Sequence, residues 1–183
     1  DCRLEEALSL VSLGQVEIIG AGPAGLYTAI LLKSSMPATR VRVSEQNPAD
    51  ATFGFGVVFS DQALDFLQAD DPDTHALITP QMERWRDMTL SLEGEEVTLD
   101  GIGFAAIGRL ELLQILQRRA IEVGVEIRFN HDLDSLEEFE DQADLIIGAD
   151  GLNSLLRRLD EPGFAPELDY SANYFAWFGT DCL

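Results

Sequence analysis

The chain has 183 residues, of which 46% are hydrophobic, so it can bury a substantial core and is expected to be globular. Thirty-three acidic against 12 basic residues give a formal charge of −21 at pH 7, which argues against nucleic acid and anionic membrane surfaces as partners. The sequence contains no run of about 18 apolar residues that could span a membrane, so we expect a cytoplasmic protein. Salt would screen the repulsion between so many carboxylates, which predicts a salt-tolerant protein.

Residues 1–14 form an N-terminal extension to the first expected strand. The segment 16–26, VEIIGAGPAGL, is a short apolar run that breaks into Gly-x-Gly-x-x-Gly and then becomes helical to about residue 35. The three glycines allow a tight turn, close approach of the backbone to phosphate, and close packing of helix on strand. The free N–H groups and the dipole at the helix start would hold a pyrophosphate. The predicted nucleotide-binding residues are Gly20, Ala21, Gly22, Pro23, Ala24 and Gly25.

A second alternating strand, RVRVSE at residues 40–45, ends in an acidic residue 25 positions beyond Gly20. In dinucleotide-binding folds a carboxylate about 20 residues after the glycine turn accepts hydrogen bonds from ribose hydroxyls and repels a 2′-phosphate. Glu45, with Gln46 beside it, is therefore predicted to bind the cofactor, and it favours FAD or NAD over NADP at this site. The alternative is an ordinary strand-to-helix turn with a solvated Glu45.

The rest of the chain alternates helical and extended patterns, which predicts an α/β fold with a parallel sheet. In the loop before residue 61, Gly54 and Gly56 flank Phe55. This loop either faces a ligand or packs Phe53 and Phe55 in the core. The other expected elements are a helix at 61–68, a hairpin near 88–99, an amphipathic helix at 109–123, a strand at 125–129, a solvated acidic helix face or loop at 132–144, a buried strand at 143–151 and an aromatic strand at 170–178.

Cysteine and histidine are too sparse to predict a metal site. Cys2 and Cys182 stand near opposite ends of the sequence without a Cys-x-x-Cys spacing, so two reduced thiols are expected. His75 and His131 have no neighbouring ligand cluster, so each is expected to be solvated or to cap a helix.

The strand over 143–151 ends in Asp150-Gly151, at the same edge of the predicted sheet as the Gly20 turn. Ligands of open α/β sheets bind at this edge. The carboxylate of Asp150 could accept hydrogen bonds from ribose or ribitol hydroxyls. It could equally cap the helix that is expected to start near Leu152.

Three blocks that occur in the order GAGPAGL, GRLELLQIL and GADGLNSLLR resemble the flavoprotein aromatic hydroxylases built on the p-hydroxybenzoate hydroxylase fold. The resemblance covers about residues 15–180. It implies a Rossmann-like FAD-binding domain over 15–165, with the hairpin near 88–99 inserted, and the beginning of a β-rich substrate domain at 166–183.

The same resemblance implies FAD as the cofactor and assigns residues to its two halves. The three motif glycines and Glu45 would hold the ADP half. Arg109 would reach the cofactor from the start of its helix, and Asp150 and Gly151 would contact the flavin nucleotide. Ser154 and Arg157 complete a DGxxSxxR pattern, in which a helix-capping role and a ligand contact are equally expected.

Within the family, the blocks TFGFGVVFSD, GIGFAAIGR, ADGLNS and FAWFGT look most like anthraniloyl-CoA monooxygenase and salicylyl-CoA 5-hydroxylase. This implies that NADH or NADPH reduces FAD, that oxygen forms a flavin hydroperoxide, and that an electron-rich aromatic ring attacks it. The implied substrate is an aminoaryl- or hydroxyaryl-CoA thioester, with no catalytic triad. Gln46 departs from the basic residue often found after the ribose acid. Indole hydroxylases of violacein biosynthesis are similar enough to be the alternative.

The family continues through a substrate-binding sheet to a later Gly-Asp motif, so this chain is expected to be the N-terminal part of a larger enzyme. A non-catalytic nucleotide-binding fragment is another hypothesis, and its exposed sheet edge would favour a homo-oligomer or a partner. An NAD-dependent dehydrogenase is disfavoured, because the sequence offers no candidate for its usual His or Tyr-Lys group.

Overall fold

The computed structural model describes residues 13–101 and 103–174. The α/β class predicted from the sequence is confirmed. The elements are β1 (Gln15–Ile19), α2 (Pro23–Ser35), β2 (Arg40–Ser44), β3 (Gly56–Ser60), α3 (Asp61–Asp70), α4 (Pro72–Ile78), the 3₁₀ turn η1 (Thr79–Gln81), β4 (Glu83–Trp85), β5 (Met88–Leu92), β6 (Glu95–Leu99), β7 (Phe104–Gly108), α5 (Arg109–Val123), β8 (Glu126–Arg128), α6 (Glu137–Glu140), β9 (Leu145–Gly148), α7 (Leu155–Leu159) and α8 (Glu161–Phe164).

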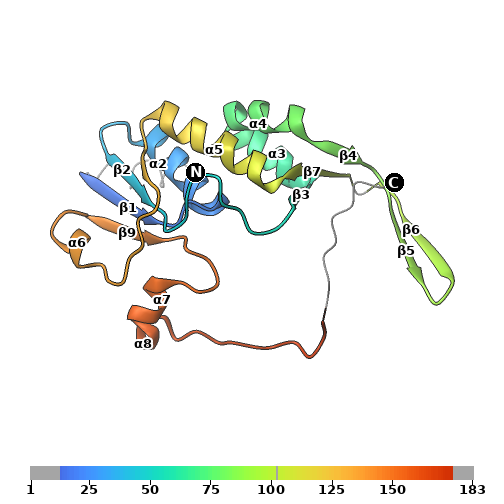
Figure 1. Ribbon diagram of the computed structural model, residues 1–183. Coiled ribbons are helices and arrows are strands. Elements are labelled where there is room, and N and C mark those ends of the chain that lie inside the picture. Colours follow the sequence, from blue (N-terminus) through green and yellow to red (C-terminus); the bar gives the residue numbers. More distant parts are fainter. Residues whose placement is uncertain (1–12, 102, 175–183) are drawn as a thin grey trace, which may run out of the picture.

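The central element is a four-stranded parallel sheet in the order β8-β2-β1-β9. On one side of it lie α2 and α5, which also pack on each other (Figure 1). Successive strand side chains point to opposite faces, so alternate residues of β1 and β2 meet these helices. The resulting core includes Val16, Ile18, Val41 and Val43 from the strands, Leu26, Ala29 and Ile30 from α2, and Leu112, Leu113 and Leu116 from α5.

The opposite face of the same strands carries a buried ion pair. Glu17 and Arg42 are register partners on β1 and β2, and Arg42 Nη2 lies 2.5 Å from Glu17 Oε1. Both side chains are at most 5% exposed, and the guanidinium lies 6.0 Å from the ring centre of Phe139 on α6. The hydrogen bond to Glu17 raises the pKa of Arg42 against the opposing effect of burial. The sequence pattern did not reveal this pair, because alternate charged residues in a strand usually indicate a solvated face.

The inserted segment between β2 and α5 forms a second, antiparallel layer. The strands β3, β7 and β4 pair in the order β3-β7-β4; α3 packs on β3, and α4 packs on α3 and α5. The predicted hairpin is confirmed as β5 and β6, with Met88 opposite Leu99, and it projects away from the parallel sheet (Figure 1). In the part of the chain that the structure describes, no helix is long and apolar enough to cross a membrane.

The predicted helices over 23–35 and 109–123 are confirmed, whereas three other expectations need correction. The strand expected to be buried over 143–151 is β9, an edge strand whose Leu145 is 40% exposed. The acidic segment 132–144 is not simply solvated, because Phe139 of α6 is fully buried. The strand expected at 170–178 is wrong for residues 170–174, which are irregular and exposed. The rest of that expected strand lies outside the described residues, as do residues 1–12 and Cys182.

Candidate functional site

The turn between β1 and α2 has the geometry that the glycine spacing predicts. Gly20 has φ +106° and donates its N–H to the Ser44 carbonyl at 2.7 Å, so the turn is joined to β2. A Cβ on Gly25 would collide with the Gly20 carbonyl oxygen, which shows why the helix can lie this close to the strand only with glycine there. Helix α2 then starts at Pro23, where the missing N–H costs no hydrogen bond.

Gly22 differs from the other two glycines because it faces open space. It is the N-cap of α2, with no side chain capping the helix, and, apart from Gly22 and its two chain neighbours, no described residue has an atom within 4 Å of the position that a Cβ would take. The amides of Ala24 and Gly25 lie in the first helical turn, where no carbonyl of the same helix can accept from them. These donors and the positive end of the helix dipole favour an anion at this point.

Glu45 follows β2 directly and is tied to the glycine turn. Its Oε2 accepts a hydrogen bond from the Ala21 N–H at 2.8 Å, and its Oε1 accepts from the Asn47 N–H at 2.9 Å and from Asn47 Nδ2 at 2.7 Å. The solvated Glu45 of the alternative interpretation is therefore wrong. A carboxylate oxygen can accept two hydrogen bonds, and Oε2 accepts only one here, so the ordered carboxylate can still accept from a ligand hydroxyl.

Asp150 lies just past the end of β9 and has two different oxygen environments. Its Oδ2 accepts from the Leu155 N–H at 2.5 Å, which confirms the capping interpretation, although α7 begins at Leu155 and not near Leu152. Its Oδ1 is buried and has no hydrogen-bond partner among the described residues. Ser154 also caps α7 by accepting from the Arg157 N–H at 3.2 Å, and Arg157 donates to the Leu152 carbonyl.

Arg109 is the first residue of α5 and lies under the glycine-flanked loop. Its N–H donates to the Phe55 carbonyl at 3.0 Å, and its side chain passes beneath Gly54, which has φ +103°. The Nε of Arg109 is buried without a partner in the part of the chain described here. A guanidinium with free hydrogen-bonding capacity can bind a phosphate or a carbonyl oxygen.

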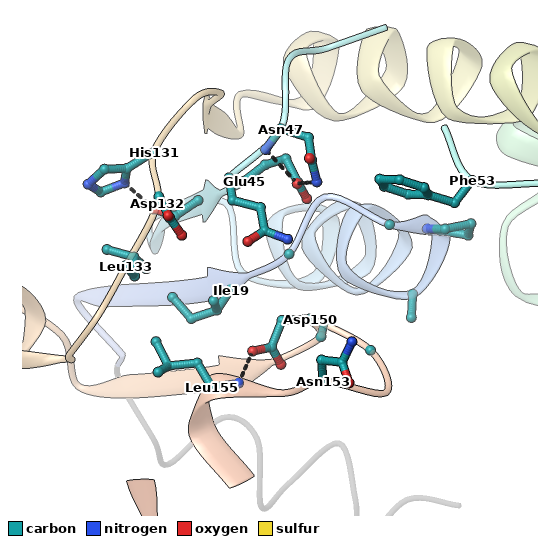
Figure 2. Close-up of a pocket in the computed structure, with 18 of the residues that line it drawn as sticks. Ile19, Glu45, Asn47, Phe53, His131, Asp132, Leu133, Asp150, Asn153 and Leu155 are labelled. Atoms are coloured by element: carbon teal, nitrogen blue, oxygen red, sulfur yellow. Dashed lines mark hydrogen bonds between the residues drawn. The ribbon is translucent and has the colours of Figure 1, made fainter. Parts of the chain in front are cut away.

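These residues meet around one cavity of about 630 Å³ at the carboxyl edge of the parallel sheet. Figure 2 shows Glu45 and Asn47 across the cavity from Asp150 and Asn153, with His131, Asp132 and Leu133 at one end and Phe53 at the other. Of the predicted site residues, those that line the cavity are Gly20, Gly22, Pro23, Ala24, Glu45, Gln46, Arg109, Asp150 and Gly151. Ala21 lines a smaller neighbouring cavity of about 80 Å³.

Several lining residues escaped the sequence analysis, namely Asn47, His131, Asp132, Leu133, Asn153 and Arg158. His131 was expected to be solvated or to cap a helix; its side chain is 28% exposed, but its ring also contacts Ser44 and Glu138. The available signal was its place just after the strand 125–129, at the edge where ligands bind.

The loop that contains Phe53 and Phe55 does not pack these rings in the core. Phe53 is 74% exposed and Phe55 is 65% exposed, so the core-packing interpretation is wrong. Phe53 instead lines the cavity. Gly54, between the two rings, has a positive φ, a backbone conformation that glycine adopts readily.

The chemistry of the cavity fits a dinucleotide with a pyrophosphate at its centre. The α2 N-terminus, Arg109 and Arg158 offer positive potential to two phosphates, while the carboxylates of Glu45 and Asp150 offer acceptors for sugar hydroxyls. The space in front of Gly22 and the buried, unpartnered Oδ1 of Asp150 are what such a ligand would fill and satisfy.

A comparison with known families matches residues 14–143 to the FAD binding domain. The chain belongs to this family. Membership of this family confirms FAD as the cofactor predicted from the sequence.

Among characterised proteins, the chain is 42% identical over 166 residues to a salicyloyl-CoA 5-hydroxylase of Streptomyces, which covers 91% of this chain and 32% of that protein. It is 26% identical to a 3-hydroxy-4-methyl-anthranilyl-[aryl-carrier protein] 5-monooxygenase of Streptosporangium sibiricum, covering 91% of this chain and 46% of the relative. It is 29% identical to the protodeoxyviolaceinate monooxygenase of Chromobacterium violaceum, covering 92% and 46%. The chain thus spans a third to a half of the length of these relatives.

Solved structures show the same fold. The tetrameric form of 2-methyl-3-hydroxypyridine-5-carboxylic acid oxygenase superposes with a TM-score of 0.67 at 24% identity, over 79% of this chain and 41% of that one. FqzB gives a TM-score of 0.63 at 22% identity, over 81% and 39%. At these identities the likeness concerns the fold alone.

Proposed function

We propose that this chain is the FAD-binding part of a monooxygenase that hydroxylates an electron-rich aromatic ring carried as a CoA thioester. The observation that carries the proposal is the 42% identity to a salicyloyl-CoA 5-hydroxylase over 91% of the chain. A second relative is named for an anthranilyl group on an aryl-carrier protein, so both names describe an aryl group attached to a carrier.

The cavity supports an orientation for FAD in which each of its parts meets matching chemistry. The pyrophosphate lies at the α2 N-terminus, in front of Gly22, and Glu45 accepts from the adenosine ribose. Asp150 and Gly151 face the flavin nucleotide, and Arg109 reaches it from the start of α5. When bound, FAD supplies the redox and oxygen chemistry, with NADH or NADPH as the electron donor.

The task left to the protein is to position a ring and exclude water, and the exposed phenylalanines fit that task. Phe53 lies at the end of the cavity opposite His131, which is the end that the flavin would occupy (Figure 2). The adjacent Phe55 is joined to the start of α5, because its carbonyl accepts a hydrogen bond from the Arg109 N–H. These apolar rings would contact the flavin or the aromatic substrate and shield them from solvent.

The test has a binding step and a reaction step. The 183-residue chain is first titrated with FAD in moderately high salt, with flavin fluorescence and visible absorbance as signals. The protein that contains this sequence is then supplied with NADH or NADPH, oxygen and either salicyloyl-CoA, anthraniloyl-CoA or the free acids. We expect saturable FAD binding and a CoA product heavier by one oxygen atom. FAD binding without any hydroxylated aryl-CoA would refute the substrate assignment.

A second candidate substrate is an indole-derived one, which the 29% identity to protodeoxyviolaceinate monooxygenase supports. The same assay with an indole substrate in competition with anthraniloyl-CoA separates the two. Faster oxygen incorporation into the indole would replace the CoA proposal. The homo-oligomer expected from the sequence stays a prediction, which light scattering would test; one solved relative of this fold is described as tetrameric.

A further inference from the structure

One histidine joins three segments of the chain at a single end of the cavity. His131 Nδ1 lies 3.1 Å from Ser44 Oγ at the end of β2, and its Nε2 lies 3.1 Å from Glu138 Oε1 on α6. The ring also meets the fully buried Phe139 edge-on, with 6.4 Å between the ring centres. An imidazole held at both nitrogens and along one edge cannot rotate freely.

The main chain reinforces this connection. The N–H of His131 donates to the Glu45 carbonyl at 2.9 Å, and the N–H of Asn130 donates to the Asn47 carbonyl at 3.2 Å. Asn130 has φ +54°, a left-handed conformation that turns the chain sharply after β8. Residues 44–47 and 131–133 thus form one continuous surface, which we call the β2–β8 wall.

The sheet order indicates which part of a dinucleotide meets this wall. The pyrophosphate site lies at the end of β1, and Glu45 lies at the end of β2, the next strand outward. The following strand is β8, so a base attached to the ribose at Glu45 extends toward the residues that follow β8. Asp132 and Leu133 line that end of the cavity, opposite the end with Phe53 (Figure 2).

We propose that His131 is a positioning residue which, through Ser44 and Glu138, holds the β2–β8 wall in the shape that binds the purine end of the cofactor. The proposal rests on the cofactor orientation given under the proposed function. Ser44 anchors the wall to the sheet, and Glu138 anchors it to α6. Without the imidazole, the wall would keep its main-chain hydrogen bonds to residues 45 and 47 but lose both side-chain attachments, so the purine would meet a less ordered surface.

The first test compares two ligands that share the purine end. Dissociation constants for FAD and for ADP are measured on the full chain, as wild type and as His131→Ala. Because the variant loses about two hydrogen bonds of positioning, both affinities should fall by the same factor, roughly ten-fold. Asp150→Asn should give the opposite pattern, with weaker FAD binding and unchanged ADP binding, because it acts on the flavin half. His75→Ala, on α4 away from the cavity, is the matched control and should change neither affinity.

Conservative variants separate positioning from general stability. His131→Asn places an amide near Nδ1 and can restore the contact with Ser44, while His131→Gln reaches toward Glu138. Recovery of ADP affinity by either variant, at a melting temperature equal to that of His131→Ala, supports the proposal.

Two results would overturn the positioning role: unchanged ADP affinity in His131→Ala, or a loss of affinity that follows the melting temperature across all the variants. If the wild-type chain binds FAD but not ADP, the cofactor orientation is wrong and this inference falls with it. If the wild type binds neither ligand, the cofactor site itself is refuted.

Discussion

Replacing Gly22 by alanine should strongly weaken cofactor binding and leave the fold intact. In the structure, Gly22 has φ −70° and ψ 175°, an extended conformation that alanine adopts without strain. Apart from its two chain neighbours, no described residue has an atom within 4 Å of the new Cβ, so the methyl group points into the cavity. Alanine is a poorer N-cap than glycine, but it also restricts the unfolded chain. These effects oppose each other, so the free energy of unfolding should change by less than about 0.5 kcal/mol.

The cost appears only when the cofactor is present. A methyl group at this position occupies the space through which a phosphate approaches the amides at the start of α2. Hydrogen bonds to a charged group contribute roughly 1.5–3 kcal/mol each, and losing about two of them removes some 3–6 kcal/mol of binding free energy. At 1.4 kcal/mol for each factor of ten, FAD affinity should fall by at least about 100-fold.

Gly25→Ala is the matched comparison, because the same added methyl group should here destabilise the fold instead of obstructing the ligand directly. Its Cβ would overlap the Gly20 carbonyl and contact Ala149 Cβ at 3.2 Å, so α2 must move away from β1. Such overpacking costs about 1–3 kcal/mol of stability. Urea unfolding and FAD titration are measured on both variants. FAD affinity of Gly22→Ala within about three-fold of wild type would refute the placement of the phosphate, because a Cβ there could not then obstruct the ligand.

Three further results are expected. Glu45→Gln keeps the side-chain shape but removes the charge that accepts from the Ala21 N–H, so the free energy of unfolding should fall by about 1 kcal/mol. ADP should also bind more weakly, and an ADP affinity equal to that of the wild type would exclude a role for Glu45 in binding the ribose. Glu17→Leu leaves Arg42 buried without its partner, so the free energy of unfolding measured in urea should fall by about 3–5 kcal/mol. The double variant that also carries Arg42→Met should regain most of this stability. The net charge of −21 predicts a melting temperature that rises from low to molar KCl, and a flat or falling value would contradict the salt-tolerance hypothesis.

The glycine turn and its partners were predictable because their geometry is local. The spacing of Gly20, Gly22 and Gly25 fixes a strand, a turn and a helix start within six residues, and Gly20 and Gly25 have the steric roles that the spacing predicts. The long helix α5 was predictable for the same reason, since its apolar period of three or four residues lies within one segment.

What the sequence concealed depends on contacts between distant segments. His131 and Ser44 are 87 positions apart, and they meet only because β8 pairs with β2. Glu17 and Arg42 have the spacing of solvated strand residues, yet the register places them opposite each other under Phe139. In both cases the partner is set by strand order and register, which a single sequence does not specify.

Asp150 shows why a motif alone could not separate a structural role from a functional one. The sequence left capping and ligand binding as equal alternatives, but a carboxylate has two oxygens, and the fold uses them differently. Oδ2 caps α7, which fixes the orientation of the side chain, while Oδ1 is left without a partner within the described part of the chain. Since a buried acceptor without a hydrogen bond is unfavourable, the cap holds in place an oxygen that a ligand hydroxyl can satisfy. In the proposed cofactor site, the capping interaction therefore orients this oxygen toward the ligand, and removing the cap through a shift of α7 should weaken FAD binding even with Asp150 intact.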